Sequence, residues 1–441
     1  MRRRSELAED MTVGRAATGS GPGPEAAGGT ARGPGAAIRA AGSLGPWGAT
    51  PADEIARRVE KVQENLERAG IDLAIIVQNA DLYYLTGTIQ QGQLLLPAHG
   101  EPLFLVRKDL GRAREESPLG NIAGIASFKE LPAAVTRLGV APTAVLGMEL
   151  DVMPVNVFRR YEPLFAQATI RDCSMAIRDS RSVKSEHELG IMADAAVIAD
   201  LAVKTASEVL REGMTEVELS ARCETTMRLA GHQGLVRFRS FNQEWAYSHI
   251  YAGPSAAVPS FGDTPLGGPG VSAAVAQGSG WRPIGRGEPV VVDLVCCAGG
   301  YCVDQTRILC LGPLPADLRE AYGACVEAQD ILKQTSRTGV ACGEIYQRVV
   351  DRVAELGYAD KFMGAPRNQM PYIAHGLGLE IDEPPYITRG SAAQLQTDQT
   401  FACEPKLVFP GRGVVGIENT WRVTPLGLTS ITISEEGIIE L

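Results

Sequence analysis

The chain has 441 residues, which is enough for two or three domains and a large core. Apolar residues make up 45% of it and charged residues 21%, the balance of an ordinary globular protein. The net charge of −10 argues against nucleic acid as a partner. No apolar run reaches the roughly 18 residues of a membrane span, and the charged N-terminus lacks the apolar segment of a secretory signal.

The chain contains 9 cysteines, an odd number, and no pair is spaced as CxxC. This usage argues against a disulfide framework and for a reducing, cytoplasmic location. Cys296, Cys297, Cys302 and Cys403 lie close in sequence to the candidate site residues described below. We expect them to be small buried hydrophobic side chains. The alternative is that one of them binds metal or acts as a catalytic thiol.

The first 50 residues are rich in Gly, Ala, Pro and Ser and contain almost no large apolar residue, so residues 1–50 are predicted to be a disordered tail. Residues 51–178 are predicted to form an α/β domain without catalytic residues. Its helix is expected over Ala52–Ala69, and Asn79–Gly87 reads as a turn followed by a short strand. Further strands are expected over Asp72–Val77, Gln93–Leu96, Leu103–Val106, Ile122–Ala126 and Ala144–Met148.

A charged segment, Ile177–Lys184, is predicted to be a linker into a second domain over residues 183–441. There a long helix and a shorter helix follow each other twice, each pair separated by a glycine-containing turn. Ser185 with Glu188, and Thr215 with Glu218, have the spacing of capping boxes. The repeat predicts two related helix–helix–strand halves around one sheet, with a site where the halves meet.

Three runs with strand character carry five side chains of the kind that binds metal. The run VVVDLVCCAGGYCVDQTR has hairpin spacing and would bring Asp293 and Asp304 to one sheet face. His375 follows in YIAHGLGLEIDEPP, and Glu404 and Glu418 lie in EPKLVFPGRGVVGIENT. Each residue alone is a weak signal, because a single aspartate can be a solvated turn residue and a single histidine a satisfied core group. Four carboxylates and an imidazole in apolar runs need a counter-ion, and a pair of divalent metals is the simplest one.

The order and spacing of these five residues resemble the pita-bread metallohydrolases, which include methionine aminopeptidase, aminopeptidase P, prolidase and creatinase. HGLGLEIDEPP is similar to the family's HGxGLxxHEPP, and EPKLVFPG…IENT is similar to its EPGxYxPG…IEDT. NADLYYLTG resembles the start of the creatinase-type N-terminal domain. The resemblance implies a C-terminal pita-bread fold, with pseudo-two-fold halves around a curved antiparallel sheet, preceded by a creatinase-like α/β domain.

The same resemblance implies a role for each candidate ligand. Asp293 would bind one metal ion, His375 and Glu404 the other, and Asp304 and Glu418 would bridge the two. This donor set suits manganese, cobalt, iron or zinc. A hydroxide between two such ions would attack an amide bond, with Glu404 as the proton shuttle. The resemblance also implies a homodimer.

The sequence departs from the peptidase members at three positions around this cluster. Asp382 stands where they carry a histidine, Ser260 replaces a second histidine, and Gly416 replaces an arginine. An ionised Asp382 cannot donate a hydrogen bond to a substrate oxyanion, but it could bind a substrate cation or accept a proton. Other groups could supply the missing donors, and the candidates for substrate binding are Arg237, Arg239, His249 and Tyr301, together with Ser260. Ordinary packing or surface charge is the alternative for each.

The leading prediction is therefore a dinuclear metallohydrolase of the aminopeptidase P and prolidase type, acting on the Xaa–Pro bond of a small peptide. A second hypothesis is creatinase-like hydrolysis or lyase chemistry on a small C–N or C–S compound, which Asp382 would suit. A third is a non-catalytic binding protein. The retention of all five ligand-type residues argues against the third hypothesis.

Overall fold

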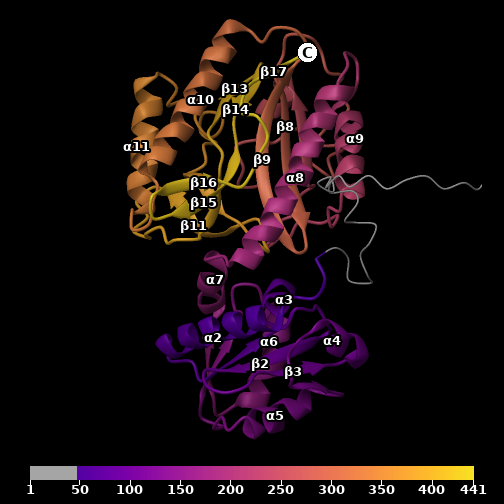
Figure 1. Cartoon of the computed structure of the whole chain (residues 1–441), viewed down its shortest axis with the longest axis vertical. Helices are drawn as coiled ribbons and strands as arrows, with labels where there is room; N and C mark the ends of the chain where they lie inside the picture. The colour runs from indigo at the N-terminus through magenta and orange to yellow at the C-terminus, as the bar shows by residue number, and fades with distance from the viewer. Residues whose placement is uncertain (1–46) are drawn as a thin grey trace, which may run out of the picture.

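The computed structural model describes residues 47–441, which form two domains, one above the other in Figure 1. The predicted tail lies outside the described residues except for residues 47–50. There the prediction of disorder is wrong, because the Trp47 indole donates a hydrogen bond to Asp194 at 3.0 Å and Thr50 is buried.

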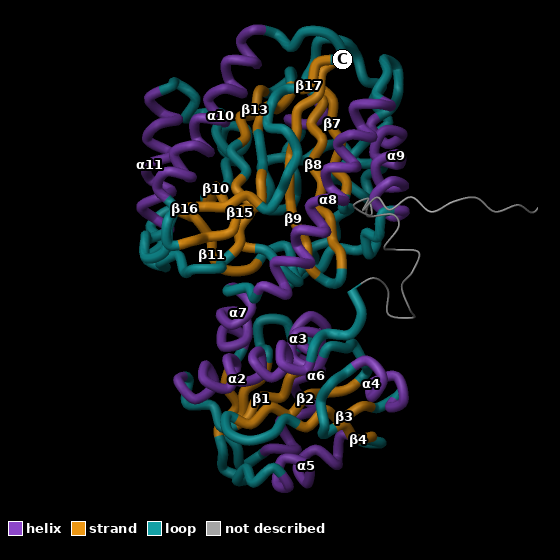
Figure 2. The backbone as a smooth tube through the Cα atoms, in the orientation of Figure 1, coloured by secondary structure: helices purple, strands orange, loops and turns teal. Residues whose placement is uncertain are grey.

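The N-terminal domain is a six-stranded mixed sheet with helices around it (Figure 2). The strand order is β4-β3-β2-β1-β5-β6, and β1–β2 and β2–β3 are antiparallel whereas the other three pairs are parallel. Five of the predicted strands are present as β1 to β5, and a sixth at the far edge, β6, was missed. The strands are β1 (Leu73–Ile76), β2 (Gly92–Pro97), β3 (Leu103–Val106), β4 (Ile122–Gly124), β5 (Val145–Met148) and β6 (Thr169–Asp172). The helices are α2 (Ala52–Arg68), α3 (Asn79–Thr86), α4 (Leu110–Glu116), α5 (Leu131–Arg137) and α6 (Val155–Tyr161).

The prediction of a turn and strand over Asn79–Gly87 is wrong, because this segment is helix α3. The Gln78 side chain accepts a hydrogen bond from the Asp81 backbone at its start, and Gly87, with φ of 75°, ends it in the left-handed region. These two caps satisfy backbone groups at both ends of a short helix. They override the strand preference of the aromatic and aliphatic residues between them.

The predicted linker is also mostly helical, as α7 (Ser174–Ser182), and it lies where the two domains meet (Figure 1). Its Arg181 is buried and forms ion pairs with Asp81 of α3 at 2.6 Å and with Glu380 at 2.9 Å, and it also pairs with Glu383. Lys184 contacts the second carboxylate oxygen of Glu383 at 3.2 Å. This buried ion network, rather than a flexible linker, joins the domains.

The C-terminal domain places strands between two helix pairs, with α8 and α9 on one side and α10 and α11 on the other (Figure 1). One sheet has the order β17-β9-β8-β7 and a second the order β11-β10-β12-β15-β16, and β13 pairs with β14. An isolated bridge between Thr306 and Glu418 joins the two larger sheets. The predicted repeat of helix pairs is therefore present, with the strands of both halves in the middle. The helices are α8 (Glu186–Val209), α9 (Glu216–Leu229), α10 (Ala316–Thr335) and α11 (Cys342–Glu355); the strands are β7 (Ser248–Ala252), β8 (Val290–Ala298), β9 (Tyr301–Cys310), β10 (Tyr372–Gly376), β11 (Glu383–Thr388), β12 (Thr400–Cys403), β13 (Lys406–Phe409), β14 (Gly413–Gly416), β15 (Asn419–Thr424), β16 (Gly427–Ser430) and β17 (Ile439–Glu440).

The predicted caps are found at the starts of α8 and α9. Ser185 and Glu188 form the full reciprocal capping box of α8. At α9 the Thr215 side chain accepts from the Glu218 backbone, which satisfies one of the free amides at that end. Across residues 47–441, no helix combines the length and the apolar character needed to cross a membrane.

Candidate metal centre

The β8–β9 hairpin carries the two aspartates, and its register places them on the same face. Asp293 lies opposite Thr306, and Asp304 lies opposite Val295. Residues paired across antiparallel strands share a face, and so do residues two apart on one strand. Both carboxylates therefore project from one side of the hairpin, as the spacing predicted.

Three further strands bring the remaining candidates to the same place. His375 is on β10, Glu404 directly follows β12, and Glu418 directly precedes β15. The strands β10, β12 and β15 are neighbours in one sheet, and the Thr306–Glu418 bridge fixes that sheet against β9. All five predicted ligand residues consequently line a single small cavity between the two halves of the domain.

Part of this cluster has the geometry of a metal site. Asp304, His375 and Glu418 are buried, and each offers one ligand atom within 4.8 Å of the other two. Asp304 Oδ1 is buried and has no hydrogen-bond partner among the described residues. A buried carboxylate oxygen without a partner is costly, and a bound cation would supply the missing contact. These three residues fit one divalent ion.

The orientation of His375 is held by the backbone. Its Nδ1 lies 2.9 Å from the carbonyl oxygen of Ile381, so Nδ1 carries the proton and donates to that oxygen. The lone pair of Nε2 is then free to face the cavity. Fixing the tautomer through the second ring nitrogen is the usual arrangement for a histidine that binds metal.

The other part of the cluster contains a residue that the sequence analysis overlooked, Lys406. Its Nζ lies 2.6 Å from Glu404 Oε2, 2.8 Å from Glu418 Oε2 and 3.5 Å from Asp293 Oδ2. The side chain is 1% exposed. An ammonium group therefore lies among three of the five candidate ligands of the expected metal ions.

Burial dominates the electrostatics of the cluster. It raises the pKa of Asp293 to about 7, and also raises the pKa of Asp304, although the Lys406 ammonium acts in the opposite direction on both. The pKa of Lys406 is itself raised, because attraction to Asp293, Glu404 and Glu418 outweighs its burial. One ammonium cannot compensate four carboxylates, three of them buried, so the excess negative charge favours binding of a further cation.

Gly416, which departs from the family's arginine, explains how Lys406 reaches the cavity. The two residues are register partners in the β13–β14 pair. A Cβ atom on Gly416 would lie 2.6 Å from Cγ of Lys406 and 2.7 Å from the carbonyl oxygen of Pro405. A side chain at position 416 and the observed path of Lys406 are therefore mutually exclusive.

Two of the residues predicted to contact substrate or protons line the cavity. Asp382 is at its rim, with its side chain 43% exposed and Oδ1 3.6 Å from His375 Nδ1. His249 is buried and lies opposite Asp293 in the β7–β8 pair. Burial, with Lys406 nearby, lowers the pKa of His249 to about 4, so its imidazole is neutral at pH 7. A neutral imidazole has one N–H to offer to a ligand.

The other candidates for substrate binding lie elsewhere and need correction. The Tyr301 hydroxyl donates to Glu188 at 2.6 Å and accepts from Arg58, in a buried contact between the domains. Arg239 pairs with Asp81 at 2.7 Å. The backbone amide of Ile381 donates to the carbonyl oxygen of Arg237, and Ser260 Oγ accepts from the backbone of Gly262. None of these four side chains lines the cavity. Tyr301, Arg239 and Ser260 are held in the polar contacts just described, and Arg237 Nη1 is buried with no hydrogen-bond partner among the described residues.

Aromatic side chains line the cavity instead. Phe238, which lies between Arg237 and Arg239 in sequence, lines it together with Trp245, and the two rings lie 5.6 Å apart. Tyr372 lines it too, and its hydroxyl donates to the Asp263 carbonyl at 2.7 Å. Lys406 had the clearest signal of the overlooked residues, since EPKLVFPG carries it where the family motif has glycine.

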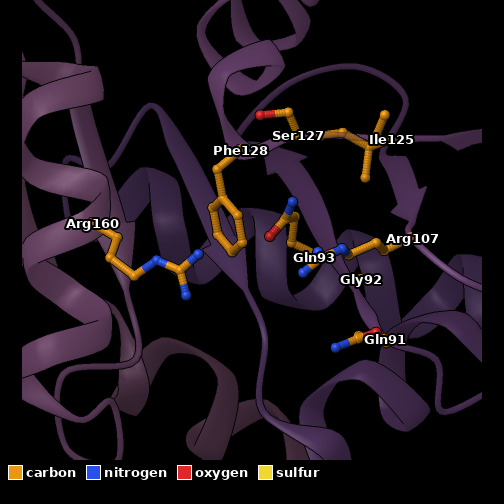
Figure 3. Close-up of a pocket in the computed structure, with 9 residues that line it drawn as sticks. Gln91, Gly92, Gln93, Arg107, Ile125, Ser127, Phe128 and Arg160 are labelled. Carbon is orange, nitrogen blue, oxygen red and sulfur yellow. The ribbon is translucent and has the colours of Figure 1, made fainter.

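Two other features are separate from the site. The thiols of Cys296, Cys297, Cys302 and Cys403 are buried outside the cavity lining, as expected for small hydrophobic side chains. A further cavity of about 160 Å³ lies in the N-terminal domain (Figure 3). It is lined by Arg107, Arg160 and Phe128 among others and contains no carboxylate or imidazole, so it offers no metal ligands.

Paired helices around central sheets, a separate N-terminal α/β domain, and buried carboxylates with an imidazole at the junction define a metallohydrolase of the pita-bread class. The model of metallopeptidase family M24 matches residues 190–425, and that of the creatinase/prolidase N-terminal domain matches residues 58–183. The chain belongs to metallopeptidase family M24. The predicted fold class and the predicted enzyme class, aminopeptidase P and prolidase-like, are confirmed.

Relatives and solved structures agree over nearly the full chain. The Xaa-Pro dipeptidase of Pyrococcus horikoshii is 27% identical over 88% of this chain and 100% of the relative. The probable dipeptidase PepE of Mycobacterium tuberculosis is 26% identical, over 86% of this chain and 95% of its own length. The crystal structure of the prolidase from P. horikoshii is similar with a TM-score of 0.72 at 25% identity, covering 87% of this chain and 100% of that one.

Proposed function

We propose that the protein is a metal-dependent hydrolase that cleaves the amide bond of small Xaa–Pro substrates in the cavity between the two halves of its C-terminal domain. The observation that carries this proposal is the buried group Asp304, His375 and Glu418, with Asp304 Oδ1 unpaired among the described residues. Carboxylates with a single imidazole suit manganese, cobalt, iron or zinc. The relatives named Xaa-Pro dipeptidase support the substrate class.

The proposal assigns a role to seven of the residues that line the cavity. A divalent ion on the three ligands would lower the pKa of bound water and polarise a substrate carbonyl. Glu404 moves the proton, because its pKa is raised by burial and its Oε1 lies 3.9 Å from His375 Nε2. His249 supplies a hydrogen-bond donor, and Phe238 and Trp245 form the apolar wall.

The test is hydrolysis of Xaa–Pro dipeptides by protein purified without chelator and supplied with Mn²⁺ or Co²⁺. Turnover is expected, and Asp304→Asn is expected to abolish it. The matched control is Asp317→Asn, which alters an exposed carboxylate that pairs with Arg412 on the surface. Turnover equal in the wild type and in Asp304→Asn would contradict the proposed site.

A second candidate, creatinase-like hydrolysis or lyase chemistry on a small cationic C–N or C–S compound, is favoured by Asp382. Its carboxylate at the cavity rim can pair with a substrate cation, whereas the histidine of the peptidase members cannot. A panel of betaines, guanidino compounds and small amides, assayed beside the dipeptides, separates the two candidates. Turnover of a cationic compound that falls in Asp382→Asn, with no dipeptide cleaved, would replace the first proposal with the second.

The location and assembly are further proposals. Nine free thiols among the described residues support a reducing cytoplasm. The homodimer implied by the family resemblance is tested by measuring the molar mass with light scattering during gel filtration.

A further inference from the structure

The Lys406 ammonium has the surroundings of a bound cation. Carboxylate oxygens of Glu404, Glu418 and Asp293 lie 2.6, 2.8 and 3.5 Å from its Nζ. An ammonium has three N–H donors and no acceptor, and the three carboxylates use all of them. The group is therefore fully engaged within the protein and has no donor left for a substrate. This excludes a direct role on the substrate and leaves a role as counter-ion.

The backbone is arranged to admit this side chain. Lys406 begins β13 immediately after Pro405, two residues from Glu404, so the strand itself delivers the ammonium to the carboxylates. Its register partner Gly416 has no side chain, and a Cβ there would come within 2.6 Å of Lys406 Cγ. The buried position of Lys406 therefore depends on the absence of a side chain at Gly416. A lysine buried to 1% exposure is retained only where its charge is paired.

We propose that Lys406 is a built-in cation that takes the place of one of the two metal ions, so that the centre binds one divalent ion, on Asp304, His375 and Glu418. One ammonium and one divalent ion together carry three positive charges against the four carboxylates. Three of those carboxylates contact the ammonium, and the remaining one, Asp304, holds the unpaired oxygen. The inference rests on the proposed ligand set, and it changes the expected number of ions.

Metal stoichiometry tests the inference independently of any substrate. Chelator-treated wild type, Lys406→Gly and Lys406→Ala are titrated with Mn²⁺ and with Co²⁺, and bound metal per chain is measured by calorimetry and by elemental analysis after gel filtration. We expect one ion per wild-type chain and two per chain in both variants, a twofold increase. Lys108→Ala, which removes an exposed lysine of the N-terminal domain, is the matched control and is expected to bind one.

Circular dichroism shows which variants are folded, and the alanine variant keeps the inference testable if the glycine variant is not. Two ions per wild-type chain would overturn the inference, and so would a single ion at saturating metal in a folded Lys406→Ala. Failure of the proposed function has a different signature. If no substrate is cleaved while the wild type binds one ion and the variants bind two, the activity is wrong and the role of Lys406 stands.

Discussion

Lys406 and Gly416 lie opposite each other in the β13–β14 pair, and a Cβ atom on Gly416 would come within 2.6 Å of Lys406 Cγ. In sequence these are two separate departures from the family pattern, a lysine for a glycine and a glycine for an arginine. In the structure the two departures are coupled, because the Lys406 side chain occupies the space that a side chain at position 416 would need. Together they place a positive charge where a metal ion was expected.

Gly416→Ala is expected to destabilise the protein by about 1–3 kcal/mol, because the added methyl group overlaps Lys406 Cγ and the Pro405 carbonyl. Urea unfolding in the presence of chelator measures this. Gly190→Ala is the control, since nothing lies within 4 Å of its Cβ position in α8. Adding Lys406→Ala should recover only part of the loss, since the backbone contacts remain. Equal free energies of unfolding for Gly416→Ala and Gly190→Ala would contradict the predicted steric overlap at position 416.

Asp304→Asn and Asp293→Asn are expected to differ in metal affinity. Asp304 belongs to the three-residue group that fits an ion, whereas Asp293 pairs with Lys406. Loss of a direct ligand should weaken Mn²⁺ binding by more than about 100-fold, which exceeds the usual effect of an outer partner. Asp293→Asn should weaken it by less than about 10-fold. Competition with a metal-sensitive dye measures the Mn²⁺ affinity of both variants. Equal losses of affinity would mean that Asp293 is also a direct ligand.

Asp382→His is expected to raise kcat/KM for Xaa–Pro dipeptides by about 100-fold, because it adds a donor for the developing oxyanion at the cavity rim. Steady-state kinetics with added Mn²⁺ measures this. Asp382→Asn is the control, because it removes the negative charge and adds an amide donor on a side chain shorter than that of histidine. A histidine variant no faster than the asparagine variant would show that position 382 does not face the scissile bond.

Arg181→Met is expected to lower the free energy of unfolding by about 3–5 kcal/mol, because it leaves Asp81, Glu380 and Glu383 buried without their shared cation. Arg412→Met removes an exposed ion pair with Asp317 and should cost less than about 1 kcal/mol. Thermal and urea unfolding measure both. Similar small losses in the two variants would mean that the network does not hold the domains together.

His232 is expected to make the protein less stable as the pH falls. Burial, with Arg228 nearby, lowers its pKa to about 4 from 6.5, and its Nδ1 accepts a hydrogen bond from the Cys297 amide at 2.9 Å. Between these two pKa values the unfolded chain binds a proton that the folded chain does not, so stability is lost on acidification. The contribution is at most about 3 kcal/mol.

His232→Gln keeps an acceptor for the Cys297 amide and should show a smaller loss of stability between pH 6.5 and pH 4.5 than the wild type. His99→Gln, at a side chain that is 77% exposed, is the control and should follow the wild type. Unfolding by urea at several pH values measures the difference. A pH dependence that is the same in all three proteins would exclude His232 as its source.

The sequence by itself determined the class of fold and the candidate ligands. Alternation of apolar residues is a local property of a strand, so the β8–β9 hairpin and the shared face of Asp293 and Asp304 followed from spacing alone. The capping box at Ser185 is local as well. By contrast, the segment over Asn79–Gly87 was misassigned, because two helix caps outweighed the strand preference of its side chains.

Only the tertiary structure decided what surrounds those ligands. Tyr301 and Arg239 have the chemistry of substrate-binding groups, but they pair with Glu188 and Asp81, which are far from them in sequence. Lys406 contacts carboxylates from within β8 and from the ends of β12 and β15, so no local pattern specifies its partners. Charge compensation depends on distances in space. For that reason the candidate ligand residues could be named from the sequence, whereas the position of the Lys406 ammonium among them could not.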